Sequence, residues 1–142
     1  MTTSDTTTSQ SAIAVVRNFL DALAASDIAT AVALLDPEIA WYNTGLPTLR
    51  GLPRVSRTLQ GMSRPSVGLN VVMHHIADDG NGVVLTERTD VLRVGRVSIA
   101  FWVCGTFEVR DGRIRVWRDH YDMATFLGAT ATGVLRAVLR RS

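Results

Sequence analysis

The stretch that organises the chain is Val84-Leu85-Thr86-Glu87-Arg88-Thr89-Asp90-Val91-Leu92. It is rich in β-branched and apolar residues and carries no helical stripe, so it predicts a β-strand. Side chains two positions apart on a strand share a face, which makes Arg88 and Asp90 neighbours. A charged pair in an apolar strand must be paired or solvated, because burying a lone charge costs several kcal/mol. The pair is therefore either a cross-strand salt bridge on a solvated face or part of a polar site in a pocket.

Composition is that of an ordinary globular domain. The chain has 142 residues, 46% hydrophobic and 20% charged, with a net charge of +2 and 15 basic residues, all of them Arg. This mild, scattered charge does not favour nucleic-acid binding. One cysteine, Cys104, excludes an intrachain disulfide, and the spacing of the three histidines predicts no metal site. No apolar run is long enough to span a bilayer.

The first ten residues are polar and rich in Thr and Ser, without the basic and apolar regions of a secretory signal. We expect residues 1–10 to be a disordered tail, residues 11–142 to form a single domain, and the protein to be cytoplasmic.

Helical and strand periodicities divide the rest of the chain. The predicted elements are an amphipathic helix at 11–25, a short helix capped by Asp27 that carries Leu34 and Leu35 and ends at Pro37, a strand at 38–43, a weak helix at 55–62, strands at 69–77, 82–94, 97–109 and 113–121, and helical segments at 122–127 and 130–140. Helices followed by long antiparallel strands are typical of an α+β fold. We expect one curved sheet to wrap over the N-terminal helices and enclose a pocket.

The register of the first long hairpin can be predicted from its turn. A two-residue turn at Val94-Gly95 would place Asp90 opposite Ile99 and Arg88 opposite Phe101.

The second hairpin leaves two alternatives. A two-residue turn at Asp111-Gly112 would turn Asp119 to the other face of the sheet, because a one-residue slip swaps every side chain. A three-residue loop over 110–112 would place Asp119 opposite Val103, on the face of Arg88 and Asp90. The site would then be lined by apolar and aromatic side chains, including Phe101, Val103, Trp117 and Tyr121.

Two carboxylates bridged by one guanidinium form an acid/base device. Like charges held close together do not both ionise easily, so one carboxyl keeps its proton. One group takes a proton from water while the other gives a proton to a leaving oxygen, and opening an epoxide in one step needs this pair of roles. No metal or cofactor is required.

Three segments carry a family resemblance. Thr86–Arg93 and Trp117–Asp122 resemble the two signature segments of the limonene-1,2-epoxide hydrolase family, and Asn43–Pro47 followed by Arg50-Gly51 is similar to its water-binding loop. The resemblance covers roughly residues 11 to 128. It implies the cone-shaped α+β fold, with a central pocket, of nuclear transport factor 2 and ketosteroid isomerase. It also implies cofactor-independent addition of water to an apolar epoxide, giving a vicinal diol, and a homodimer formed through the outer sheet face.

The resemblance also implies residue roles and favours the three-residue loop. Asp119 would be the general base on water, Asp90 the general acid on the epoxide oxygen, and Arg88 the bridge, with Asn43 positioning the water. Trp41 stands where the family has a tyrosine, and its indole N–H can donate but not accept a hydrogen bond. Either Trp41 holds the water or the neighbouring Tyr42 replaces it.

Two other functions remain open. An isomerase or cyclase of the same fold would need one base and an oxyanion donor rather than two bridged carboxylates. A small-molecule binding or dimerisation module would need no catalytic pair at all.

Overall fold

The computed structural model describes the backbone of residues 2–140 and the side chains of residues 12–122, 128 and 130–140. The elements in chain order are α1 (Thr2–Ala24), α2 (Ile28–Ala33), β1 (Leu35–Asn43), β2 (Leu49–Arg50), α3 (Leu52–Gly61), β3 (Val67–Asp78), β4 (Val83–Val94), β5 (Val97–Arg110), β6 (Arg113–His120) and α4 (Met123–Leu139). The strands form one sheet in the order β2-β1-β6-β5-β4-β3, in which β1 runs parallel to β6 and the other neighbours are antiparallel.

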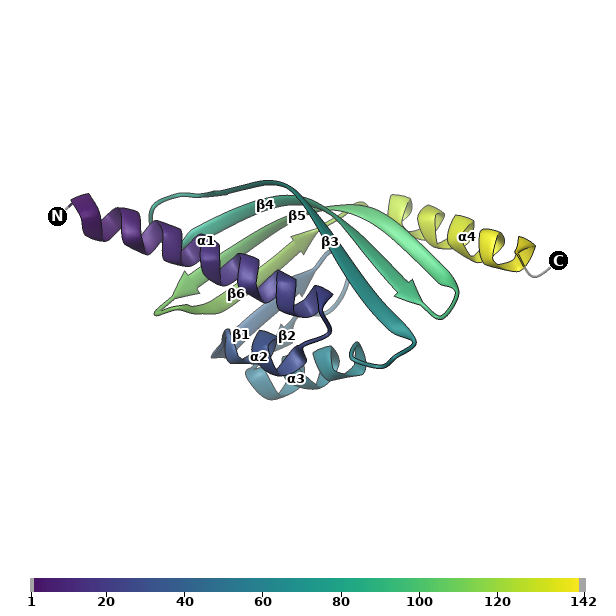
Figure 1. Cartoon of the computed structure of the whole chain (residues 1–142), viewed down its shortest axis with the longest axis horizontal. Helices are drawn as coiled ribbons and strands as arrows, with labels where there is room; N and C mark the ends of the chain where they lie inside the picture. Colours follow the sequence, from purple (N-terminus) through teal and green to yellow (C-terminus); the bar gives the residue numbers. More distant parts are fainter. Residues whose placement is uncertain (1, 141–142) are drawn as a thin grey trace.

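The helices α1, α2 and α3 lie on one side of the curved sheet. The helix α4 extends beyond the end of the sheet, opposite the N-terminus (Figure 1). This arrangement confirms the predicted α+β fold with a mixed, curved sheet over N-terminal helices. None of the helices in residues 2–140 combines the length and the hydropathy needed to cross a membrane.

The apolar face of α1 seals the concave side of the sheet. Phe19 is fully buried and meets Phe107 and Trp117 edge-on, with ring centroids 6.5 and 4.9 Å apart. Such edge-to-face contacts fix the angle of the helix as well as burying apolar area. The helix begins at Thr2, inside the segment predicted to be a disordered tail, and residues 2–10 contain no proline or glycine to interrupt it.

The boundary between α2 and β1 differs from the prediction. Asp27 caps α2 as expected, since its Oδ1 accepts a hydrogen bond from the Thr30 backbone N–H at 3.3 Å. Leu34, however, is already the C-cap, and Leu35 begins β1. Pro37 lies within β1, where the ladder to β6 shifts register, and a proline without an N–H donor is tolerated at such an irregularity.

The turn of the first long hairpin lies one residue later than predicted. Val94 pairs with Val97, so the turn residues are Gly95 and Arg96, and Gly95 has a φ of 60°. The predicted register is therefore wrong by two residues. Arg88 pairs with Val103 and Asp90 with Phe101, and both keep the predicted face because a shift of two preserves side-chain direction.

The second hairpin uses the two-residue turn, and not the three-residue loop that the family resemblance favours. Asp111 and Gly112 form a two-residue turn with φ values of 53° and 76°, as a type I′ turn requires, so the three-residue loop is wrong. A β-bulge then restores the face. Ile114 pairs with Val109 and Val116 with Glu108, which leaves Arg115 as an extra residue on β6.

Because of this bulge, Asp119 pairs with Gly105 rather than with Val103, and it lies on the same face as Arg88 and Asp90. Two departures from the prediction, the shorter turn and the bulge, cancel each other in their effect on side-chain direction.

Candidate functional site

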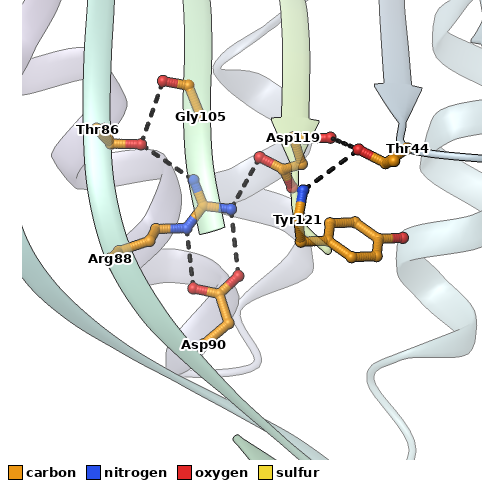
Figure 2. A network of polar contacts seen from close by, with 7 residues as sticks. All are labelled: Thr44, Thr86, Arg88, Asp90, Gly105, Asp119 and Tyr121. Carbon is orange, nitrogen blue, oxygen red and sulfur yellow. Dashed lines mark hydrogen bonds and ion pairs between the residues drawn. The ribbon is translucent and has the colours of Figure 1, made fainter. Parts of the chain in front are cut away.

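Arg88, Asp90 and Asp119 meet on the concave face of the sheet (Figure 2). The Arg88 Nε donates to Asp90 Oδ1 at 2.9 Å, and its Nη2 donates to Asp90 Oδ2 at 3.2 Å and to Asp119 Oδ1 at 2.8 Å. The Arg88 side chain is 1% exposed and both carboxylates are buried. The cross-strand pair is thus a buried three-residue bridge and not a salt bridge on a solvated surface.

The strand β1 brings the predicted water-binding residues beside Asp119. In the parallel register Asn43 pairs with Asp119 and Trp41 with Trp117. The end of β1 is tied to β6 by Thr44, whose backbone N–H and hydroxyl donate to the Asp119 carbonyl oxygen, both at 3.3 Å. Asn43 therefore lies next to the carboxylate that the sequence predicts to be the base.

The indoles of Trp41 and Trp117 stack on each other, with centroids 4.0 Å apart and planes 4° from parallel. Both Nε1 atoms are buried, and neither has an acceptor within hydrogen-bond geometry among the described residues. The Trp117 N–H is nevertheless close enough to Asp119 to offset part of the rise that burial causes in the pKa of that carboxyl. Tyr42 points away from the site, where its hydroxyl accepts a hydrogen bond from Arg50 Nη2 and its ring faces Arg118. Of the two alternatives for holding the water, only Trp41 lies at the site.

A cavity of about 170 Å³ opens beside the three charged residues. Its wall consists of Leu20, Leu23, Trp41, Asn43, Met62, Leu69, Arg88, Asp90, Leu92, Phe101, Trp117, Asp119 and Tyr121. The predicted lining residues Phe101, Trp117 and Tyr121 are among them. Val103 is not among them. Its register position opposite Arg88 places it on the same face of the sheet, but its side chain is fully buried.

Burial and charge act in opposite directions on this cluster. Burial raises the pKa of Asp119 above the ordinary 3.8, and the neighbouring Arg88 charge only partly offsets this. Burial by itself would lower the pKa of Arg88, but the two carboxylates outweigh it and the net shift is upward. Burial, and then the Asp119 charge, also raise the pKa of Tyr121. The guanidinium stays charged, and Asp119 binds a proton more readily than an exposed aspartate does.

Sequence reasoning missed two residues that contact the guanidinium. Thr86 Oγ1 accepts a hydrogen bond from Arg88 Nη1 at 3.1 Å, and Gly105 lies directly beneath that nitrogen. The available signal was a glycine inside an apolar strand, which often marks a close approach by another group. The lining residues Leu20, Leu23 and Met62 were also missed, because they come from or follow helices whose packing on the sheet the sequence pattern does not specify.

Among the described residues, no group of His, Cys, Asp and Glu side chains is arranged to hold a metal ion. The chemistry that the site offers is proton transfer between buried carboxyl groups and whatever enters an otherwise apolar cavity.

Comparison with known proteins agrees with this geometry. Residues 10–132 match the model of the limonene-1,2-epoxide hydrolase catalytic domain. The chain is 40% identical to Epoxide hydrolase EphG of Mycobacterium tuberculosis over 124 residues, covering 87% of this chain and 82% of that protein. A solved structure of an M. tuberculosis LEH-like epoxide hydrolase superposes with a TM-score of 0.86 at 39% identity, covering 93% of this chain and 98% of the other.

More distant structures share the fold alone. One is a putative polyketide cyclase from Pseudomonas putida, with a TM-score of 0.73 at 14% identity, covering 84% and 97% of the two chains. Taken with the matches above, the buried Asp-Arg-Asp cluster on a nuclear transport factor 2-like sheet leads to one conclusion: the chain belongs to the limonene-1,2-epoxide hydrolase family and is an epoxide hydrolase.

Proposed function

We propose that the protein adds water to an apolar epoxide in one step, without a cofactor, and that Asp119, Arg88 and Asp90 carry the reaction. The observation behind the proposal is one buried guanidinium that holds two carboxyl groups at the wall of an apolar cavity. Asp119 takes a proton from water as the water oxygen attacks an epoxide carbon. The carbon–oxygen bond of the ring breaks, and Asp90 gives its proton to the leaving oxygen.

At the end of the step Asp119 carries a proton and Asp90 has lost one, so Asp119 must release its proton and Asp90 must take one up, directly or through solvent, before the next turnover. The Arg88 charge stabilises at least one ionised carboxylate in the pair. Burial and mutual repulsion disfavour the ionisation of both. One proton is therefore shared between the two carboxyl groups over the cycle.

The residues around Asp119 support its assignment as the base. It lies next to Asn43 and to the stacked indoles, so donors for a water molecule are at hand. Its raised pKa also makes it a stronger base once it is ionised, which is what proton abstraction from water needs. We assign Asn43 and the buried N–H of Trp41 to hold that water, and Phe101, Trp117 and Tyr121 to contact the substrate.

The test is diol formation from a panel of terpene, styrene and lipid epoxides. Asp90→Asn and Asp119→Asn should each lower turnover by about a hundredfold or more. Asp21→Asn, an exposed carboxylate on α1, serves as the control. Wild-type turnover in either site variant would remove that residue from its role.

A single turnover in ¹⁸O-labelled water separates direct attack from a covalent ester. Direct attack puts the label in the diol from the first turnover. An ester hydrolysed at its carboxyl carbon would instead leave unlabelled oxygen, taken from the aspartate, in the first diol. Unlabelled first-turnover product would contradict the one-step mechanism.

An isomerase or cyclase is the less supported alternative. Such an enzyme pairs a single base with a neutral oxyanion donor, whereas Arg88 bonds to both carboxyl groups here.

We further propose that two copies of the chain associate through the outer face of the sheet. Val72, Leu85 and Trp102 lie on that face and are 45%, 55% and 52% exposed. Large exposed apolar side chains on one surface are typical of interfaces. Light scattering should give the mass of a dimer for the wild type and of a monomer for Trp102→Glu. Leu46→Glu, an exposed position in the loop between β1 and β2, should remain dimeric. A monomeric wild type would contradict the proposal.

A cytoplasmic location completes the proposal, because a chain with one cysteine gains nothing from an oxidising compartment. Cell fractionation would contradict it if the protein were recovered outside the cytoplasm.

A further inference from the structure

We infer that Thr86 and Gly105 are positioning residues for the proposed hydrolysis: together they hold the Arg88 guanidinium in the one orientation that joins Asp90 to Asp119. The inference rests on the proposed function for its activity readout, but the placement of the guanidinium can be tested without turnover.

The problem that these residues solve is one of distance. Arg88 is on β4 and Asp119 is on β6, with β5 between them. Neighbouring strands are about 4.8 Å apart, so the guanidinium has to cross a gap of about 10 Å over the backbone of β5. The residue of β5 at the crossing point is Gly105, which pairs with Thr86 on one side and with Asp119 on the other (Figure 2).

Gly105 is required there for space. A Cβ at this position would lie 2.5 Å from Arg88 Nη1 and 2.7 Å from Thr86 Oγ1, far inside contact distance. The backbone conformation does not demand glycine, because Gly105 is not among the glycines with positive φ. Any other residue would therefore push the guanidinium off β5, and with it the contact to Asp119.

Thr86 fixes the rotation of the guanidinium. Its hydroxyl accepts from Arg88 Nη1 at 3.1 Å and donates to the Gly105 carbonyl oxygen at 3.4 Å. The other two nitrogens of Arg88 bond to the carboxylates, so each guanidinium nitrogen has a partner. The Phe107 ring lies 5.9 Å from Arg88 Cζ and supports the group from another side.

Neither Thr86 nor Gly105 lines the cavity, so they act on the reaction only through Arg88. Loss of the Thr86 hydroxyl leaves Nη1 without its acceptor and lets the planar group tilt. The hydrogen bonds that the guanidinium donates to Asp90 and to Asp119 then change in length and angle. Substrate binding should be little affected, whereas proton transfer should slow.

The experiment compares Thr86→Val, which removes the hydroxyl at constant shape, with Thr86→Ser, which keeps it. We expect Thr86→Val to lower kcat by about a hundredfold, as a displacement of about 1 Å at a catalytic group does. KM should stay within about threefold, and the acid limb of the pH–rate profile should move, because the guanidinium no longer holds both carboxyl groups at their present distances. Thr86→Ser should restore kcat to within about threefold of wild type.

The matched control is Thr58→Val, the same substitution on the exposed surface of α3, where the Thr58 hydroxyl donates to the Arg54 carbonyl oxygen and not to the site. It should leave kcat and the pH profile unchanged. Gly105→Ala should reproduce the loss seen in Thr86→Val, because the added methyl group occupies the place of Nη1.

Wild-type kcat and pH profile in Thr86→Val would overturn the inference, and so would an equal loss in Thr86→Ser, because packing rather than the hydroxyl would then be responsible. If Thr86→Val does not fold, Thr86→Ala removes the hydroxyl without that branched side chain and is judged by the same criteria. If the wild type turns over no epoxide, the proposed function fails, and crystal structures decide the inference separately. An Arg88 side chain in Thr86→Val that keeps both carboxylate contacts unchanged would refute it.

Discussion

Replacing Arg88 with methionine should destabilise the protein by an amount that depends strongly on pH. The guanidinium is 1% exposed and holds two buried carboxylates at 2.9 and 2.8 Å. Removing one partner from a buried ion pair typically costs about 3–5 kcal/mol, because the remaining charge has no compensation. Here two carboxylates lose the same partner. We therefore expect the free energy of unfolding to fall by about 4 kcal/mol at neutral pH, out of a typical total of about 5–15 kcal/mol.

The pH dependence follows from the carboxyl groups. Without Arg88, the charge that partly offsets the effect of burial is lost, so the pKa of Asp119 in the folded state rises further than in the wild type. The folded Arg88→Met protein then binds more protons than the unfolded chain, so its stability is retained below the ordinary carboxyl pKa and is lost as the pH rises through the raised value. The difference from wild type should be small near about pH 4 and largest near about pH 8.

Urea denaturation followed by circular dichroism at both pH values measures this difference. The matched control is Arg115→Met, which breaks an exposed pair with Glu38 at 3.1 Å and should cost less than about 1 kcal/mol at either pH. Adding Asp90→Asn and Asp119→Asn to Arg88→Met should recover most of the stability lost at high pH. A loss below about 1 kcal/mol at both pH values, or an equal loss at both, would refute the reasoning.

Three further predictions concern the base, the core and the cavity. Burial raises the pKa of Asp119 above 3.8, so kcat/KM should rise with pH through a limb above that value, and a pH–rate profile with its acid limb below 3.8 would contradict this. Phe19→Ala should lower the free energy of unfolding by about 3–5 kcal/mol in urea titrations, because the ring is fully buried against two aromatic side chains. Met62→Ala should enlarge the cavity of about 170 Å³. It should therefore raise kcat/KM for a bulky epoxide relative to a compact one when the two compete, and an unchanged ratio would place Met62 away from the substrate.

The parts of the fold and site that follow from local spacing were predictable. Arg88 and Asp90 are two residues apart on a strand, so they share a face in any register, and the structure brings them into contact. The helix cap at Asp27 and the order of helices before strands are equally local signals.

The features that depend on distant contacts were not predictable. The bulge at Arg115 lies where β6 is paired with both β1 and β5, and the Ile114 backbone N–H donates to the Leu34 carbonyl oxygen at 2.8 Å. Both ladders shift register near this point, so the extra residue reflects tertiary pairing that the hairpin sequence alone does not contain. The cavity wall also depends on distant contacts. Leu20 and Met62 reach it only because α1 and the segment after α3 pack there.

Arg115, the extra residue of the β-bulge on β6, has a consequence for how such enzymes diverge. Deleting Arg115 would remove the bulge but leave Val116 opposite Glu108 and Asp119 opposite Gly105, so Asp119 would keep its face and its contact with Arg88. Two relatives with the same signature segments can therefore differ by one residue in this hairpin and still bring both carboxylates to the same guanidinium. The pairing of Asp119 with Gly105, and not the number of residues between the turn and the signature segment, is what the site requires.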